Sequence, residues 1–241
     1  MQLHEGRIDS VQSEMNISLK IVDKDGSKTV AEFLDLLDRG PLSYQRGLDI
    51  QNELHSKVVS REIDDTIILL QHSPVFTAGK RSEDHELPND GTEVIQTNRG
   101  GKITWHGPGQ LIGYPIMKLP QPIDVVGYVR WIENVLIEVL SEFNIKGKTV
   151  SGRSGVWVET KSGDEKIAAI GIRVSEKVTM HGFALNVNNS LEAYEKFIPC
   201  GIDDAGVTTM SKLLAGNVQL PEVAKSVMRL MRKIGEYEPA R

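Results

Sequence analysis

The sequence contains a single cysteine, Cys200, in a chain of 241 residues. One cysteine excludes an internal disulfide, and a lone thiol is typical of a reducing compartment. The chain also lacks any apolar run that approaches the ~20 residues of a membrane-spanning helix. Residues 1–16 lack the basic start and the apolar core of a signal peptide. These absences predict a cytoplasmic protein without a membrane partner.

The chain has no excess of positive charge. Its 28 Lys and Arg residues stand against 33 Asp and Glu residues, which gives a formal net charge of -5. This balance predicts no nucleic-acid partner, because binding to phosphate backbones depends on clustered cations. An acidic protein partner would therefore need a local basic patch.

Motifs that bind phosphate or metal are missing as well. The stretch GPGQLIG has one residue too many for a dinucleotide fingerprint, and EFNIKGKT lacks the first glycine of a P-loop. The six histidines form no HExxH pair, and one cysteine allows no zinc-finger spacing. We therefore predict neither a cofactor nor a metal site.

Helix and strand patterns are mixed along the chain. The clearest helix is predicted over 124–143, where apolar residues recur at spacings of three and four. Further helices are expected over 42–59, with Ser43 as the N-cap, and over 220–237. Strands are predicted in TIILLQ, SGVWVET, KIAAIGIRVS and KVTMHGFALNVN, the last two as a hairpin that turns near Glu176. The lack of regular βαβ alternation predicts an α+β fold with a mostly antiparallel sheet and packed helices.

The stretch RGGKITWHGPGQ, residues 99–110, combines a cation, glycines and a histidine. Arg99 precedes Gly100 and Gly101, where a ligand can approach the backbone closely. His106 is followed by a rigid Gly-Pro-Gly turn that would fix its ring. A glycine-rich hairpin with a surface histidine is the alternative, and spacing alone does not separate the two.

Lys166 begins one of the predicted strands. Strict alternation would place it on one face with Ala168, Ile170 and Ile172. Apolar neighbours partly desolvate an amine and favour its neutral form. The alternative is a lysine at a strand end that extends into water.

Cys200 lies between Pro199 and Gly201, which suggests a tight turn rather than a core strand. Free cysteines are more often buried apolar side chains than reagents. A nearby ammonium would nevertheless favour the thiolate, which is the nucleophilic form. Cys200 and Lys166 are therefore a candidate pair, although the sequence alone does not bring them together.

Several motifs occur together in one order: SYQRGLDIQ, LLQHSPVFTAGKR, RGGKITWHGPGQLIGYPI, GRSGVWV, KIAAIGIRVS, MHGFALNVN and IPCGI. With them the chain resembles the lipoyl(octanoyl) transferase family of lipoate synthesis over roughly residues 31–215. The resemblance implies the α+β fold of the catalytic domains of biotin and lipoate protein ligases. We expect an N-terminal extension over residues 1–30 and a single octanoyltransferase catalytic domain over 31–241.

The resemblance also implies an activity. Such enzymes move the octanoyl group of octanoyl acyl carrier protein to a specific lysine of lipoyl domains, in 2-oxoacid dehydrogenases and in the glycine cleavage H protein. By motif, Cys200 would be the nucleophile that becomes a thioester, and Lys166 would favour the thiolate and relay protons. His72 and Tyr114 are weaker candidates for the pocket wall.

The substrate pocket implied by the resemblance involves three segments. Trp105 is a mild departure, because many relatives have tyrosine there. The implied pocket residues are Arg99, Gly100, Gly101, Lys102, Ile103, Thr104, Trp105, His106, Ala169, Ile170, Gly171, Gly182, Phe183 and Ala184.

A basic rim could steer the acidic carrier protein, and its candidates are Lys80, Arg81, Arg99, Lys102 and Arg153. Two other functions stay open at this point. An ATP-dependent lipoate or biotin ligase of the same architecture would not need Cys200. A non-catalytic module that binds acyl carriers would form no covalent adduct.

Overall fold

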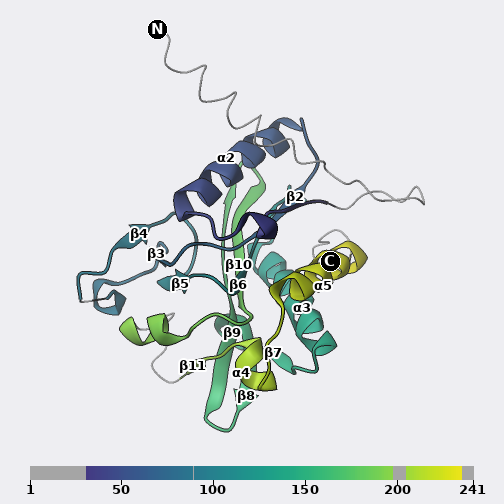
Figure 1. The fold of residues 1–241 in the computed structure, drawn as a ribbon. Helices are drawn as coiled ribbons and strands as arrows, with labels where there is room; N and C mark the ends of the chain where they lie inside the picture. The colour runs from purple at the N-terminus through teal and green to yellow at the C-terminus, as the bar shows by residue number, and fades with distance from the viewer. Residues whose placement is uncertain (1–30, 89, 198–204, 235–241) are drawn as a thin grey trace.

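The computed structural model describes residues 31–88, 90–197 and 205–234, and it is drawn in Figure 1. Cys200 and the predicted extension, residues 1–30, lie outside the described residues. The elements are, in order, β1 (Glu32–Asp35), η1 (Leu37–Arg39), α2 (Tyr44–Ser60), β2 (Thr66–Leu70), β3 (Val75–Ala78), η2 (Asp84–Glu86), β4 (Val94–Gln96), β5 (Thr104–His106), β6 (Gln110–Ile116), α3 (Val125–Glu142), β7 (Gly147–Val150), β8 (Arg153–Thr160), β9 (Gly163–Ser175), β10 (Val178–Asn186), η3 (Glu192–Lys196), β11 (Gly206–Val207), α4 (Met210–Leu214) and α5 (Leu220–Ile234).

The main sheet has the strand order β1-β2-β6-β10-β9-β8-β7, and β11 pairs with β9 off this path. β1 runs parallel to β2 and β11 runs parallel to β9, whereas the other neighbouring pairs are antiparallel. Helices pack on both faces of this sheet. The predicted α+β fold with a mostly antiparallel sheet is therefore confirmed.

Strands β9 and β10 form the long hairpin that the sequence predicts. Ser175 pairs with Val178 across the turn, where Glu176 and Lys177 have φ of 51° and 68°. Positive φ at both central positions is the geometry of a type I′ turn, whose twist matches that of antiparallel strands. The turn near Glu176 is confirmed, and it sets the register of two strands that contribute to the site.

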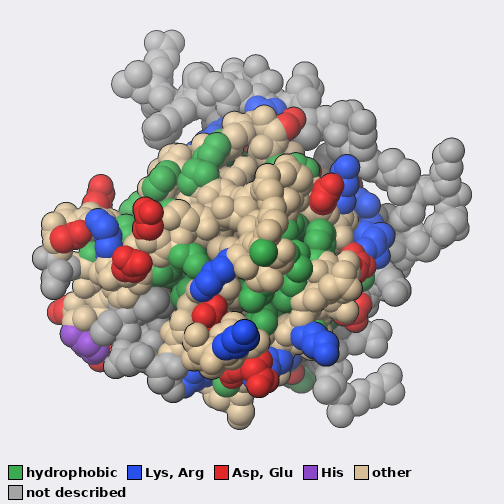
Figure 2. Space-filling model, turned by 60° about the horizontal axis from the view of Figure 1, so that its bottom comes forward, with side chains coloured by type: hydrophobic (Ala, Val, Ile, Leu, Met, Phe, Trp, Pro, Cys, Tyr) green, Lys and Arg blue, Asp and Glu red, His purple; other side chains and the backbone are tan. Residues whose placement is uncertain are grey.

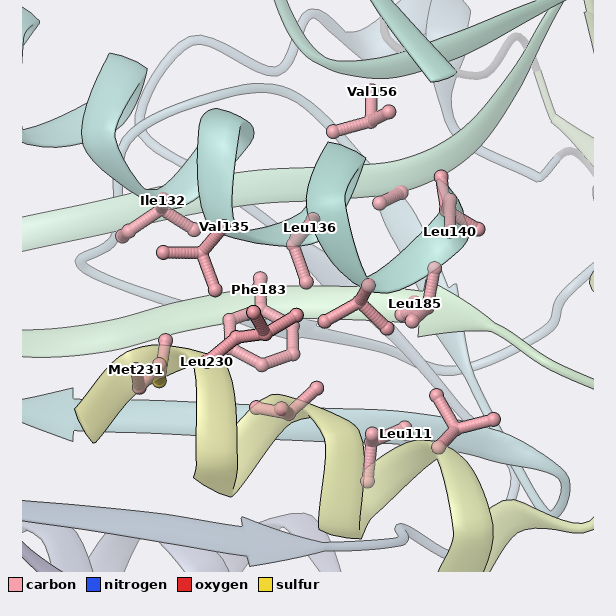
Figure 3. Close-up of a cluster of buried hydrophobic side chains, with 14 of the residues drawn as sticks. Leu111, Ile132, Val135, Leu136, Leu140, Val156, Phe183, Leu185, Leu230 and Met231 are labelled. Carbon is pink, nitrogen blue, oxygen red and sulfur yellow. The ribbon is translucent and has the colours of Figure 1, made fainter. Parts of the chain in front are cut away.

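Residues of β2 alternate between two apolar cores. Ile67 and Leu69 pack with α3 and α5, whereas Ile68 and Leu70 pack beneath α2, which covers the opposite face (Figure 1). Figure 3 shows the larger core, where α3 and α5 meet β6 and β10 through side chains that include Ile132, Val135, Leu136, Leu140, Leu230, Met231, Leu111, Phe183 and Leu185.

Helix α3 follows its prediction closely and contains a buried glutamate. Asp124 caps its N-terminus by accepting a hydrogen bond from the Gly127 N–H at 2.8 Å. Glu133 is fully buried, and its Oε1 accepts the Gly155 N–H of β8 at 2.8 Å. Its Oε2 pairs with Arg130 at 2.5 Å. The helix thereby holds β8 beside the strand that contains Lys166.

Strand β9 contains an irregularity directly after Lys166. Val156 pairs with Ala168, whereas the next residue of β8, Trp157, pairs with Lys166, so that Ile167 is an extra residue on β9. Ile167 and Ala168 consequently both pack in the larger core. The expected shared face of Lys166 with Ala168 is wrong, because this bulge breaks the period-two alternation.

A smaller sheet with the order β4-β3-β5 lies to one side of the main sheet, at the left of Figure 1. β3 pairs in parallel with β4 and antiparallel with β5. The loop between β4 and β5 is joined to the main sheet, because the Gly100 N–H donates to the Ile172 carbonyl of β9 at 2.9 Å. This junction between the two sheets is where the candidate site lies.

Candidate functional site

A cavity of about 240 Å³ opens at the junction between the two sheets. It brings together predicted pocket residues from three separate segments: Arg99, Gly101, Lys102, Ile103, Thr104, His106, Ala169, Ile170, Gly171, Gly182, Phe183 and Ala184. Lys166 also lines it, as does the weaker candidate Tyr114. Cys200, the other half of the candidate pair, lies outside the described residues.

Two predicted pocket residues do not line the cavity. Gly100 instead links its loop to β9 through the Ile172 carbonyl. Trp105 packs edge-on against Tyr194, with ring centres 6.0 Å apart, in a small cluster with Phe76 and Phe197. Neither residue lines the cavity, and both instead join a cavity-lining segment to a neighbouring part of the fold.

Six further residues line the cavity without having been expected in the pocket: Tyr44, Arg81, Gly152, Arg153, Ser154 and His181. Tyr44 begins α2, whose helical pattern indicates only an apolar stripe. His181 has a φ of 57°, and the Gln51 side chain of α2 accepts its backbone N–H at 2.7 Å. A left-handed residue inside a strand leaves no periodic signal that could reveal it.

Arg99 is buried and shapes the loop beside the cavity. Its guanidinium donates to the backbone carbonyls of Thr77 at 2.6 Å, Lys102 at 2.8 Å and Gly100 at 3.0 Å. The expected place of Arg99 on an exposed basic rim is wrong, because these carbonyls turn the cation inward. Gly101 completes the loop with a φ of 84°, a conformation that favours glycine.

Lys102 forms ion pairs with two acidic neighbours at the edge of the cavity. It pairs with Glu86 and, at 3.2 Å, with Glu83. The hydrogen bond that Lys102 donates to Glu86 raises its pKa most, and the one that it donates to Glu83 raises it further. Most of its charge is thus compensated locally, which weakens it as a candidate for steering a carrier protein.

Three buried histidines lie at or behind one wall of the cavity. His72 Nδ1 donates to the Leu42 carbonyl at 3.1 Å, so its Nε2 accepts the Tyr114 hydroxyl at 2.7 Å. Burial lowers the pKa of His72 to about 4 and raises the pKa of Tyr114 well above its ordinary value. His72 itself lies behind Tyr114, which lines the cavity.

The other two histidines near the cavity are neutral for the same reason. Burial, and then the neighbouring His72, lowers the pKa of His106 to about 3. Burial, and then Arg99 and Arg173, lowers the pKa of His181 to about 4. At neutral pH these rings present dipoles without charge to the cavity.

Lys166 lies at the side of the cavity nearest to β11. The residue is 8% exposed, and its Nζ lies 4.7 Å from the centre of the Trp157 ring. A Cβ on Gly155, whose φ is 105°, would lie 2.3 Å from the Ala168 carbonyl oxygen and 3.4 Å from Lys166 Cε. Only glycine therefore lets β8 approach β9 closely enough to seat this lysine.

Residues 198–204, which contain Cys200 and lie outside the described residues, are called the Cys200 segment here. The chain on both sides of this segment is fixed near the cavity. Before it, Phe197 packs edge-on against Phe76 at 5.6 Å and shares a cluster with the cavity residue Ile103. After it, Val207 of β11 pairs with Lys166, and the Thr208 N–H donates to the Lys166 carbonyl at 3.0 Å.

No group of three or more His, Cys, Asp or Glu side chains among the described residues could hold a metal ion. Of the helices in the described ranges, none has the length and apolar character to cross a membrane.

Comparisons with known proteins identify the family. Residues 43–232 match the family described as the lipoyl protein ligase A/B catalytic domain. An octanoyltransferase of Leifsonia xyli subsp. xyli is 52% identical over 198 residues, covering 81% of this chain and 88% of its own. An octanoyltransferase of Acidothermus cellulolyticus is 53% identical over 190 residues, covering 78% and 86%.

A solved structure of a bi-partite lipoate protein ligase from Thermoplasma acidophilum aligns with a TM-score of 0.63 at 12% identity, covering 84% of this chain and 82% of that one. This likeness shows the α+β fold. The chain belongs to the lipoyl protein ligase A/B catalytic-domain family. Within it the chain groups with the octanoyltransferases, which confirms the resemblance and makes it an acyltransferase. The division into residues 1–30 and 31–241 stays a prediction.

Proposed function

We propose that this acyltransferase moves the octanoyl group from octanoyl acyl carrier protein to a specific lysine of lipoyl domains, through a thioester on Cys200. The lipoyl domains are those of 2-oxoacid dehydrogenases and the glycine cleavage H protein. The observation that carries the proposal is Lys166, which lines the cavity and pairs with the strand that follows the Cys200 segment. The names of the curated relatives support octanoyl as the group transferred.

The first half-reaction loads the enzyme. The Cys200 thiol passes its proton to the Lys166 amine, and the thiolate attacks the carbonyl carbon of the carrier thioester. The bond to the phosphopantetheine sulfur breaks, and that sulfur leaves with the proton returned by Lys166. Lys166 Nζ lies 4.7 Å from the centre of the Trp157 ring, so the ammonium that forms beside the thiolate contacts the face of this ring.

The second half-reaction unloads the enzyme. The acceptor lysine attacks the Cys200 thioester as a neutral amine, and Lys166 accepts the proton that this nitrogen loses. The carbon–sulfur bond breaks, an amide forms, and the same proton restores the Cys200 thiol. The acyl group arrives already activated as a thioester, so no nucleotide is consumed.

Close backbone packing explains the small residues beside the cavity. A Cβ on Gly182 would lie 2.1 Å from the Gly113 carbonyl oxygen, and one on Gly171 would lie 2.8 Å from the Gly100 carbonyl oxygen. Glycine at these positions keeps the strands close and leaves the cavity open to an acyl chain. Each buried methylene contributes about 0.8 kcal/mol, so the depth of the cavity can sense chain length.

The test that separates this function from a ligase is transfer without nucleotide. We expect the purified chain to octanoylate a lipoyl domain from octanoyl acyl carrier protein with no ATP or Mg²⁺ present. The product is followed by the mass of the lipoyl domain, and free octanoate serves as the comparison substrate. Transfer from free octanoate that depends on ATP would instead identify an ATP-dependent lipoate or biotin ligase.

Arg81 is the best-placed cation for an acidic carrier protein. It is exposed, lines the cavity and, among the described residues, has no ion pair. On the face shown in Figure 2, Lys and Arg side chains are interspersed with Asp and Glu, so attraction depends on local cations rather than on a broad basic surface.

Arg81→Glu should raise KM for octanoyl acyl carrier protein by about five- to tenfold at low ionic strength, with a smaller effect at high salt. The matched control is Lys225→Glu, which makes the same change of charge at an exposed position on α5. Steady-state kinetics at two salt concentrations provide the measurement. An equal rise in KM for both variants would contradict a local role for Arg81.

A further inference from the structure

Two buried amide side chains, Gln110 and Asn186, face each other on neighbouring strands. They are 1% and 3% exposed, and they form a cross-strand pair between β6 and β10. Gln110 Nε2 donates to Asn186 Oδ1 at 2.9 Å. Buried amides cost free energy unless each polar atom finds a partner, so their remaining contacts indicate what the pair is for.

Asn186 reaches the chain that follows the Cys200 segment. Its Nδ2 donates to the Thr208 carbonyl at 3.1 Å, and the Thr208 N–H donates to the Lys166 carbonyl at 3.0 Å. A continuous series of hydrogen bonds therefore connects Gln110, through Asn186 and Thr208, to the backbone of Lys166.

Gln110 reaches the chain that precedes the same segment. Its Nε2 also donates to the Tyr194 hydroxyl at 3.0 Å. The Tyr194 ring lies 5.6 Å from that of Phe197, the last described residue before the segment. On its other side, Gln110 Oε1 accepts from His106 Nδ1 of the cavity wall at 2.8 Å.

We propose that Gln110 and Asn186 form a positioning pair, which fixes both described flanks of the Cys200 segment relative to Lys166. Neither amide lines the cavity, so they act through the alignment of the thiol with the amine. Apolar residues at two adjacent buried positions would pack without the cost of burying amides, so the amides provide a defined geometry rather than bulk stability. This inference rests on the proposed role of Cys200 and Lys166.

The test is a double-mutant cycle on the reactivity of Cys200 toward iodoacetamide at neutral pH, read by intact mass. Asn186→Leu, which keeps the side-chain size, should slow alkylation about tenfold when Lys166 is present. In a Lys166→Ala background the same substitution should slow it less than about twofold, because no amine remains to be aligned. In turnover, kcat should fall by about 10²-fold while KM for octanoyl acyl carrier protein changes little.

Two further variants separate alignment from folding. Tyr194→Phe removes only the hydroxyl on the preceding flank and should show the same coupling to Lys166 on a smaller scale. Asn188→Ala is the matched control, because it also loses a bond to a backbone carbonyl, that of Val218 at 2.9 Å, outside the pair. It should lower the unfolding midpoint without changing the alkylation rate.

The outcomes are distinct. Equal slowing by Asn186→Leu in both backgrounds, or no slowing in either, would overturn the positioning role. Failure of the wild-type chain to form any octanoyl adduct would instead reject the proposed function. Alkylation requires no octanoyl donor, so the two failures are recognised separately.

Discussion

Cys200→Ala is expected to remove the octanoyl adduct completely and to lower transfer to a lipoyl domain by about 10⁴-fold or more. The reason is that the acyl group has no other thiol to occupy, since this cysteine is the only one in the chain. Loss of a covalent nucleophile eliminates the two-step route, and only approximation of the substrates remains. Intact mass spectrometry after incubation with octanoyl acyl carrier protein measures the adduct, and the mass of the lipoyl domain measures transfer.

Cys200→Ser serves as the chemical control for this substitution. A serine hydroxyl is a poor nucleophile without a strong base, so slow loading or none is expected, with binding of the carrier protein retained. Transfer by Cys200→Ala at a rate near that of the wild-type chain would contradict the thioester mechanism. Carrier binding without an adduct in the wild-type chain would indicate a binding module.

Lys166→Ala is expected to lower kcat by about 10²- to 10⁴-fold, the usual contribution of a proton-transferring group. The unfolding midpoint should stay within about 4 °C of the wild type, since the bulge and the pairing with β11 use only the backbone of this residue. Lys161→Ala, at an exposed position in the turn between β8 and β9, is the matched control and should retain full turnover.

Lys166→Arg separates the two proposed roles of this side chain, as a cation beside the thiolate and as a base that accepts protons. Arginine keeps a cation near the thiol, which favours loss of the thiol proton to water, but it cannot accept a proton itself. Loading of Cys200 should therefore persist in part, whereas transfer to the acceptor lysine, which needs a base, is lost. Single-turnover loading and unloading, followed by mass, provide the measurement. Turnover of Lys166→Ala close to that of the wild-type chain would reject the assigned role.

Long periodic segments made most of the fold predictable. The apolar spacing of α3, the Ser43 cap of α2 and the hairpin at Glu176 all follow from local rules of helix and turn formation. The same motifs also indicated three segments that meet at one cavity. Their meeting could be expected only from the family resemblance, because spacing along a chain does not determine which strands pair.

The parts that could not be predicted are non-local or aperiodic. The bulge at Ile167 breaks the alternation on which the surroundings of Lys166 were inferred. Arg99 and Lys102 were expected as cations of a basic rim. Arg99 instead donates hydrogen bonds to backbone carbonyls, and Lys102 forms an ion pair with Glu86. No sequence pattern predicts either set of partners. The left-handed conformation of His181 likewise depends on Gln51, which is far away in sequence.

The three buried, neutral histidines also make the stability of the fold depend on pH. In an unfolded chain each of these imidazoles takes up a proton near its ordinary pKa of 6.5. In the folded chain burial lowers the pKa of His72 and His181 to about 4 and the pKa of His106 to about 3, so these rings stay neutral until the pH falls to those values. Unfolding between these limits therefore binds protons, so the stability that these three neutral histidines contribute is fully present above about pH 6.5 and is lost progressively as pH falls below it.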